Sequence, residues 1–202
     1  MFQASAVPIF DGEASIDTFL IRLQNCSMII RLIIFAIGTL GIVFISLHSA
    51  TKLRSYGLLR FFAFESILVL ILYNVEHWFR NPFSVLQVIS WLLMIASVVI
   101  VSSGFYMLRK FGKPKDVIDD TAVLVTRGIY KYIRHPLYSS LMLLAWGVFL
   151  KDISLVSFTL VLVASGLPVA MAKVEEKDNI RKFGDDYSKY IKTTKMFIPF
   201  II

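Results

Sequence analysis

Two clusters of chemically capable side chains occupy the second half of the chain. The first is the stretch 124–138, LVTRGIYKYIRHPLY, in which basic residues and three tyrosines lead into an apolar run. The second is the pair Glu175 and Glu176, which follows the last apolar run and precedes KFGDDYSKY. Such side chains bind charged ligands, donate hydrogen bonds and transfer protons. If both clusters face the same side of a membrane, they can form the two halves of one active site.

Composition places the chain in a membrane. Of its 202 residues, 57% are hydrophobic and 17% are charged, and the mean hydropathy is +0.73. A helix needs about 20 mostly apolar residues to cross about 30 Å of hydrocarbon, and the candidate runs are 28–50, 58–75, 85–108, 136–150 and 154–172. We therefore predict an all-α integral membrane protein with about five transmembrane helices, a cytoplasmic cofactor-binding loop and a C-terminal helix.

We expect residues 1–202 to form a single membrane domain. Its parts are an N-terminal segment (1–27), three spans (28–108) and a catalytic half (109–202) that contains spans four and five and the tail. Cys26 is the only cysteine and the three histidines are scattered along the chain, so we predict no metal site.

The distribution of charge predicts the orientation of the spans. The connection 109–134 holds seven basic and three acidic residues, whereas the segment 1–27 holds three acidic residues and one basic residue. Because Lys and Arg collect on the cytoplasmic side, we expect a multi-pass protein with an extracytoplasmic N-terminus and a cytoplasmic C-terminus. The net charge of +7 then reflects topology and contact with membrane lipids, and we expect no nucleic acid partner.

Each polar cluster also has a purely structural interpretation. Arg134 and Tyr138 are typical of the belt that anchors a helix at the membrane surface, although His135 is not a usual member of such a belt. Glu175 and Glu176 fit the first solvated turn beyond a membrane helix.

Glu65 lies near the middle of a span, where a charge is costly. We expect it either to form a structural hydrogen bond, with Thr39 among the candidates, or to line a substrate tunnel.

The order of the motifs resembles a known family. LVxxGxYxxxRHPxY is followed by an apolar helix pair, EE, FGxxYxxY and a late proline. This combination resembles the superfamily of isoprenylcysteine carboxyl methyltransferases and phospholipid methyltransferases, which are integral membrane enzymes. The resemblance covers about residues 112–199. It implies methyl transfer from S-adenosylmethionine to a lipophilic acceptor, either a prenylated molecule or a lipid.

The resemblance also implies roles for individual residues. In the family, the LV segment and the residues before it surround the adenosine of the donor. The implied cofactor-binding residues are Lys115, Ala122, Val123, Leu124, Val125, Tyr130, His135, Pro136, Leu137, Tyr138 and Glu175. The catalytic candidates are Arg134 and Glu176. A carboxylate acceptor needs a cationic partner such as Arg134 or Lys173, and an amine acceptor needs a base such as Glu176.

Departures from the family pattern affect the acceptor more than the donor. The prenylcysteine enzymes have an arginine where this chain has Met171, and Lys173 is the nearest basic replacement. Met171 and Lys173 are therefore the substrate-binding candidates, and we expect poor activity on farnesylcysteine analogues. A related arrangement in sterol reductases leaves NADPH-dependent reduction as an alternative. A noncatalytic membrane scaffold or a small transporter is a third possibility.

Overall fold

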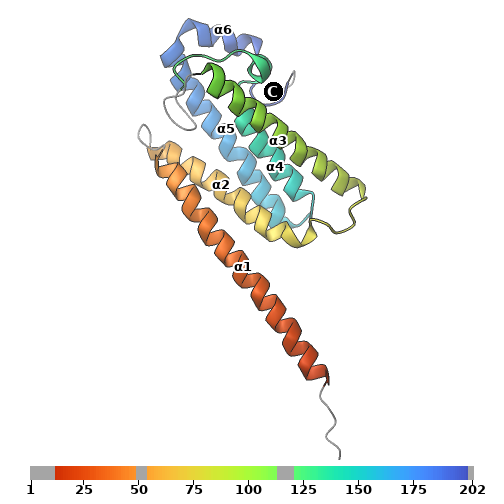
Figure 1. Cartoon of the computed structure of the whole chain (residues 1–202). Coiled ribbons are helices and arrows are strands. Elements are labelled where there is room, and N and C mark those ends of the chain that lie inside the picture. Colours follow the sequence, from red (N-terminus) through yellow and green to blue (C-terminus); the bar gives the residue numbers. More distant parts are fainter. Residues whose placement is uncertain (1–11, 49–53, 113–120, 200–202) are drawn as a thin grey trace, which may run out of the picture. The chain divides into compact units, whose positions relative to one another are not determined.

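A computed structural model of the protein describes residues 12–48, 54–112 and 121–199. These residues form helices and loops, and no β-strand occurs among them. The helices, shown in Figure 1, are α1 (Gly12–His48), α2 (Arg54–Asn74), α3 (Val85–Phe111), α4 (Pro136–Phe149), α5 (Leu155–Phe183) and α6 (Asp185–Thr193), with the short 3-10 helices η1 (Val75–His77) and η2 (Gly128–Lys131).

The chain divides into two compact units, Met1–Ile37 and Gly38–Ile202. In the first unit, α1 begins at Gly12, within the expected N-terminal segment 1–27, and continues without a break into the first expected span. Helix α1 then extends into the second unit. The expected single domain with its internal boundaries stays a prediction.

Among the residues that the structure describes, four helical segments are long and apolar enough to cross a membrane. They are Ser27–Ser46, Gly57–His77, Val85–Phe111 and Leu155–Phe183. Helix α4 is also apolar, but its 14 residues make it shorter than a standard span. The prediction of an all-α integral membrane protein is confirmed. With 29 residues, α5 exceeds the roughly 20 needed for a crossing, so its last turns, which carry Glu175 and Glu176, extend toward the membrane surface.

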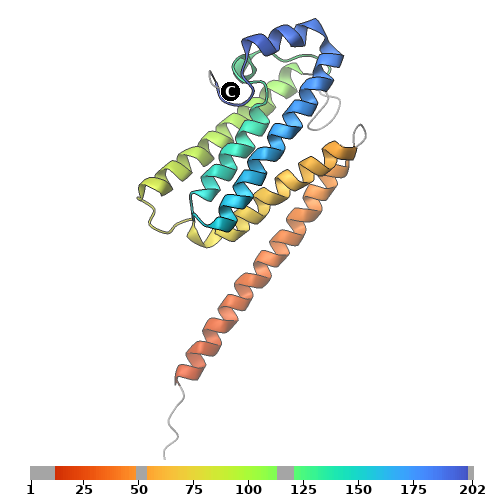
Figure 2. The ribbon, with the colours of Figure 1, turned by 180° about the vertical axis from the view of Figure 1, so that it is seen from behind.

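In the second unit the helices lie in the order α3, α4, α5, α2 (Figure 2). Helices α3 and α4 pack closely because small residues line their contact. Ser90 Oγ donates a hydrogen bond of 2.6 Å to the carbonyl of Gly147, and Ser97 Oγ donates one of 2.7 Å to the carbonyl of Ser140. Small and hydroxyl-bearing residues are the usual means by which membrane helices approach each other.

Helices α2 and α5 pack antiparallel along one continuous seam. Its apolar centre contains Ile67 and Leu70 of α2 with Val161 and Ala164 of α5. At one end, Ser157 Oγ donates a 3.0 Å hydrogen bond to Asn74 Oδ1, and Asn74 Nδ2 donates to the carbonyl of Val148 on α4. Because an amide in the hydrocarbon needs internal partners, these bonds fix how α2 and α5 are aligned.

Two further polar residues of the bundle have internal partners. Thr39 Oγ1 donates a 2.8 Å hydrogen bond to Glu65 Oε1. A structural hydrogen bond of this kind was one of the two roles expected for Glu65. In the loop between α4 and α5, Lys151 is buried, and burial lowers its pKa. Its Nζ lies 2.8 Å from Gln87 Oε1 and 3.8 Å from the ring centre of Trp91. A cation over an indole face is an attractive contact.

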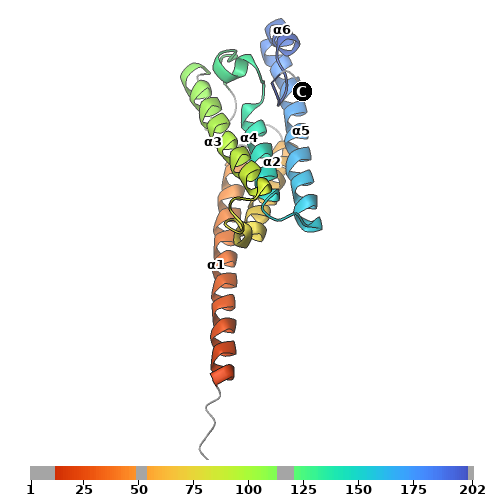
Figure 3. The same cartoon turned by 90° about the vertical axis from the view of Figure 1, so that its right-hand side faces the viewer.

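The end of the bundle that carries residues 121–135 and α6 is here called the site end, and it lies at the top of Figure 3. Two glycines shape it. Gly128 has φ +61 at the start of η2, and a Cβ there would lie 2.8 Å from the Met107 side chain. Gly184 has φ +58 and separates α5 from α6. Residues that carry a side chain rarely adopt these backbone angles, so both turns favour glycine.

The fold predicts that cysteines introduced at the site end react with an impermeant reagent from one side of the membrane only. In a Cys26→Ser background, single cysteines at Lys131 and Lys189 should react with an impermeant reagent from the cytoplasmic side, and a cysteine at Ile153 from the opposite side. All three positions are exposed, so reactivity reports sidedness and not burial. Labelling of Lys131 and Lys189 from opposite sides would contradict the arrangement.

Candidate active site

Hydrogen bonds join the C-terminal segment after α6 to the segment that precedes α4. Ile133 and Lys195 form a parallel β-bridge. The amide of Arg134 donates to the carbonyl of Lys195 at 2.8 Å, and the amide of His135 donates to the carbonyl of Met196 at 3.1 Å. Ser139 Oγ adds a 2.8 Å bond to the carbonyl of Phe197. We call residues 194–197 the C-terminal clasp.

The guanidinium of Arg134 joins three parts of the site. Its Nε donates to Glu176 Oε1 on α5 at 2.7 Å. Its Nη1 donates to the carbonyls of Thr194 at 2.5 Å and Ile191 at 3.2 Å. The side chains of Arg134 and Glu176 are 8% and 14% exposed, so this ion pair is largely shielded from solvent. Charge-assisted bonds of this kind are stronger than neutral ones.

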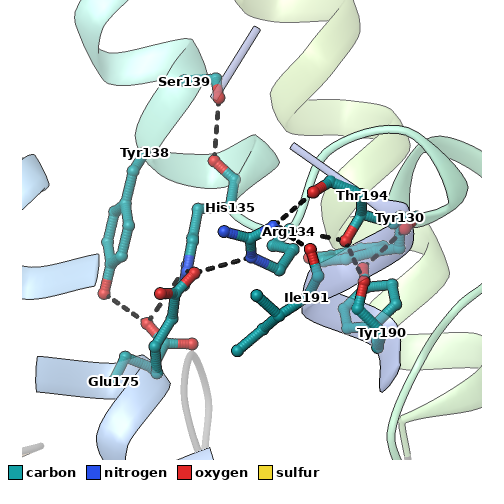
Figure 4. A network of polar contacts seen from close by, with 10 residues as sticks. Tyr130, Arg134, His135, Tyr138, Ser139, Glu175, Tyr190, Ile191 and Thr194 are labelled. Carbon is teal, nitrogen blue, oxygen red and sulfur yellow. Dashed lines mark hydrogen bonds and ion pairs between the residues drawn. The ribbon is translucent and has the colours of Figure 1, made fainter. Parts of the chain in front are cut away.

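The two predicted clusters meet around Glu175, which Figure 4 shows, and around its neighbour Glu176. Tyr138 donates a 2.8 Å hydrogen bond to Glu175 Oε2, and its ring stacks on His135 with 5.5 Å between ring centres. The His135 ring is buried, with Nδ1 3.8 Å from Glu175 Oε2 and Nε2 3.4 Å from Glu176 Oε1. One imidazole thus lies between two carboxylates that belong to the end of α5.

Buried tyrosines complete the wall of the site. Tyr190 donates a 2.6 Å hydrogen bond to the carbonyl of Tyr130, which joins α6 to η2. Burial raises the pKa of Tyr187 to about 12 and raises the pKa values of Tyr130 and Tyr190 well above the usual value, with Glu175 adding to the effect at Tyr130. These hydroxyls therefore stay protonated at neutral pH and remain hydrogen-bond donors.

A cleft of about 500 Å³ opens beside this network. It lies between the extended segment before η2 and the junction of α5 with α6, and it is lined by Ala122, Val123, Leu124, Thr126, Phe183 and Asp186. Lys182 Nζ donates to the carbonyl of Thr121 at 2.6 Å and connects the two walls. The cleft combines apolar side chains, an aromatic ring and one carboxylate, which is a common lining for a small polar ligand.

The structure places most of the predicted site residues at this end of the bundle. Ala122, Val123 and Leu124 line the cleft, Val125 and Tyr130 are buried beside it, and Pro136, Leu137 and Tyr138 form the first turn of α4. Lys115 lies outside the described residues. Met171 is buried on α5, whereas Lys173 is exposed. Residues two apart on a helix do not share a face, so Lys173 points away from Met171 and Glu175.

Sequence reasoning did not assign the clasp or the far wall of the cleft. Thr194 and Phe197 were missed because their contribution is made mainly through backbone carbonyls, which no motif reveals. Phe183 and Asp186 stand in the FGxxYxxY segment that the sequence had singled out, and Tyr187 and Tyr190 of that segment are both buried. The spacing of these tyrosines was the available signal, because residues three apart share a helix face.

Comparisons with known proteins agree with this arrangement. Residues 85–186 match the protein family described as Phospholipid methyltransferase. Protein-S-isoprenylcysteine O-methyltransferase A of Arabidopsis thaliana is 25% identical over 196 aligned residues, which cover 88% of this chain and 94% of the relative. Both matches support methyl transfer, and neither supports the reductase that the sequence left as an alternative.

The Arg134–Glu176 pair should hold the clasp in place. We expect Arg134→Gln to lower the free energy of unfolding in detergent by about 2–3 kcal/mol, because Glu176 and the carbonyls of Thr194 and Ile191 lose their charged donor. Trypsin should then cleave faster at Lys195, which limited proteolysis can measure. The matched control is Arg181→Gln, since Arg181 is 80% exposed. Unchanged stability and cleavage in Arg134→Gln would contradict the role of this ion pair.

Proposed function

Because the chain belongs to the phospholipid methyltransferase family, and is thus a membrane methyltransferase with a lipophilic substrate, we propose that S-adenosylmethionine is its methyl donor. The proposal places this donor at the site end, in the cleft lined by residues 122–126 and against Glu175. The observation that carries it is the Glu175 carboxylate, held by Tyr138 and His135 near the tyrosine wall that flanks the extended segment.

The lining of the site is compatible with each part of such a donor. The extended segment 122–126 offers backbone N–H and C=O groups and the apolar side chains of Val123 and Leu124 to an adenine ring. Asp186 offers a carboxylate to ribose hydroxyls, because carboxylates accept strong hydrogen bonds. Glu175 and Glu176 place negative charge where a sulfonium or an ammonium group would be stabilised.

When bound, the donor would supply an electrophilic methyl carbon on a sulfonium, and transfer of that methyl group to the acceptor would release the thioether without a covalent enzyme intermediate. The chain's own task is then to orient the acceptor and exclude water. The buried side chains of Tyr130, His135 and Tyr190 exclude solvent from the base of the site. We assign Arg134 a positioning role, because its guanidinium holds Glu176 and the clasp.

Two acceptor chemistries fit the lipophilic class. An amine head group must lose a proton, and Glu176 is the carboxylate proposed to accept it. A carboxylate head group needs no base but needs a cation nearby. In either case the apolar tail stays in the bilayer, where each buried CH₂ contributes about 0.8 kcal/mol. The donor is water-soluble, so we propose that the site end faces the cytoplasm, as the charge distribution predicted.

Donor binding should depend on Glu175. We expect Glu175→Gln to weaken binding of S-adenosylhomocysteine by about 1.5–3 kcal/mol, the scale of a lost charge-assisted hydrogen bond. Isothermal titration in nanodiscs measures the dissociation constant directly. The control is Glu65→Gln, because Glu65 bonds to Thr39 and not to the site. Equal affinity of Glu175→Gln and the unmutated protein would exclude Glu175 from the donor site.

A substitution that fills the cleft tests whether the donor binds there. Ala122 is exposed on the cleft wall, so Ala122→Trp should occupy the space proposed for the adenosine and weaken S-adenosylhomocysteine binding by about 1.4 kcal/mol or more, a factor of ten. Val163→Trp is the matched control, since Val163 is exposed on α5 and lies within a candidate span. Full donor affinity in Ala122→Trp would place the donor elsewhere.

A further inference from the structure

Two exposed cations at the site end are held over aromatic rings and not by carboxylates. Lys110 stands on the last turn of α3, and Arg127 immediately precedes η2. Within the parts of the chain that the structure describes, no ion pair joins either side chain to a carboxylate. The positive charge of both side chains is therefore open to an anion from outside the chain.

The ring of Phe111 positions both charges. Lys110 Nζ lies 5.5 Å from the centre of this ring, and Arg127 Cζ lies 5.6 Å from it. Lys110 Nζ also donates a 2.9 Å hydrogen bond to the hydroxyl of Tyr106. Cations within about 6 Å of an aromatic face are attracted to it. Because an ammonium and a guanidinium each carry several N–H donors, both groups keep donors for a further acceptor.

The segment that carries Arg127 is fixed against the end of α3. The amide of Val123 donates to the carbonyl of Gly112 at 3.2 Å. Helix η2 packs on α3, where a Cβ at Gly128 would collide with Met107. Figure 3 shows this segment beside the upper end of α3. The cations and their rings thus form one surface, and we call Tyr106, Lys110, Phe111 and Arg127 the basic patch.

The basic patch lies where a membrane span reaches the surface. The candidate span Val85–Phe111 has 27 residues, more than the roughly 20 needed for a crossing, and Lys110 stands at its end. Tyr106 is 53% exposed, and tyrosine favours the membrane–water interface. On the same face of α3, Ile95 and Val99 are 56% and 59% exposed, as expected of side chains in contact with acyl chains. The basic patch is therefore at the depth of lipid phosphates.

We propose that Lys110 and Arg127 bind the phosphate group of an anionic membrane lipid at the end of α3. A guanidinium can bind a phosphate through two parallel hydrogen bonds, and an ammonium adds a compact charge. The acyl chains of this lipid lie along the exposed apolar face that contains Ile95 and Val99. A free phosphate or a carboxylate of another protein would use the donors and leave this face uncovered.

This lipid site is distinct from the proposed donor site, because neither Lys110 nor Arg127 lines the donor cleft. Lipid binding at the basic patch therefore does not depend on which donor or acceptor the protein uses.

Two probes that differ in one group test the site. They are phosphatidic acid and diacylglycerol with the same acyl chains and the same fluorescent label on one chain, so that only the phosphate differs. Dissociation constants are measured by fluorescence anisotropy with the full chain in a non-ionic detergent. The samples are the unmutated protein, the double variant Lys110→Gln/Arg127→Gln and the control Arg181→Gln/Lys189→Gln. Arg181 and Lys189 are exposed cations of α5 and α6, and their replacement removes the same charge.

We expect the unmutated protein and the control to bind phosphatidic acid about tenfold more tightly than diacylglycerol, because each basic residue near a membrane surface attracts anionic lipid. The Lys110→Gln/Arg127→Gln variant should lose this preference and keep its affinity for diacylglycerol. Inorganic phosphate in large excess should not displace the labelled phosphatidic acid. Thermal unfolding of each sample reports whether the variant is folded.

Equal binding of the two probes by the unmutated protein would overturn the proposal, and this comparison needs no variant to fold. A folded Lys110→Gln/Arg127→Gln variant that retains the preference would place the phosphate elsewhere. An equal loss in the control would assign the preference to net charge and not to the basic patch. Displacement by inorganic phosphate would show that the ligand is a free anion and not a lipid.

Discussion

The ion pair between Arg134 and Glu176 is the contact on which the site depends. It connects the segment before α4 to the end of α5, and the same guanidinium holds the carbonyls of Thr194 and Ile191. The segment before α4 is far in the sequence from the other two parts, and the backbone bonds of the clasp support the same contact. Because the pair is largely shielded from water, removing one of its partners costs more than removing a partner of an exposed salt bridge. His135 and Glu175 are brought together as a result.

Beneath this site, the bundle is aligned by a few internal hydrogen bonds. Packing in a membrane gains little from the hydrophobic effect between helices, so small residues and polar contacts decide how helices fit. Ser90 and Ser97 join α3 to α4, and Asn74 joins α2 to α4 and α5. The same contacts align α5, whose far end carries Glu175 and Glu176.

Sequence reasoning predicted the helices and the meeting of the two clusters because both follow from local patterns. Apolar runs define spans, and the RHPxY and EE motifs carry recognisable chemistry. It could not predict the clasp, since Lys195, Met196 and Phe197 act there through backbone carbonyls. It also could not predict that Arg60, near the start of a span, is only 2% exposed, because the burial of a side chain on α2 depends on how that helix packs.

We propose that the two clusters form the site of a sulfonium methyl donor. The decisive measurement is thermal unfolding of the protein in nanodiscs with S-adenosylhomocysteine or NADPH added. We expect S-adenosylhomocysteine at 100 times its dissociation constant to add about 2.7 kcal/mol to the free energy of unfolding, and NADPH to add nothing. Stabilisation by NADPH and not by S-adenosylhomocysteine would contradict the claim.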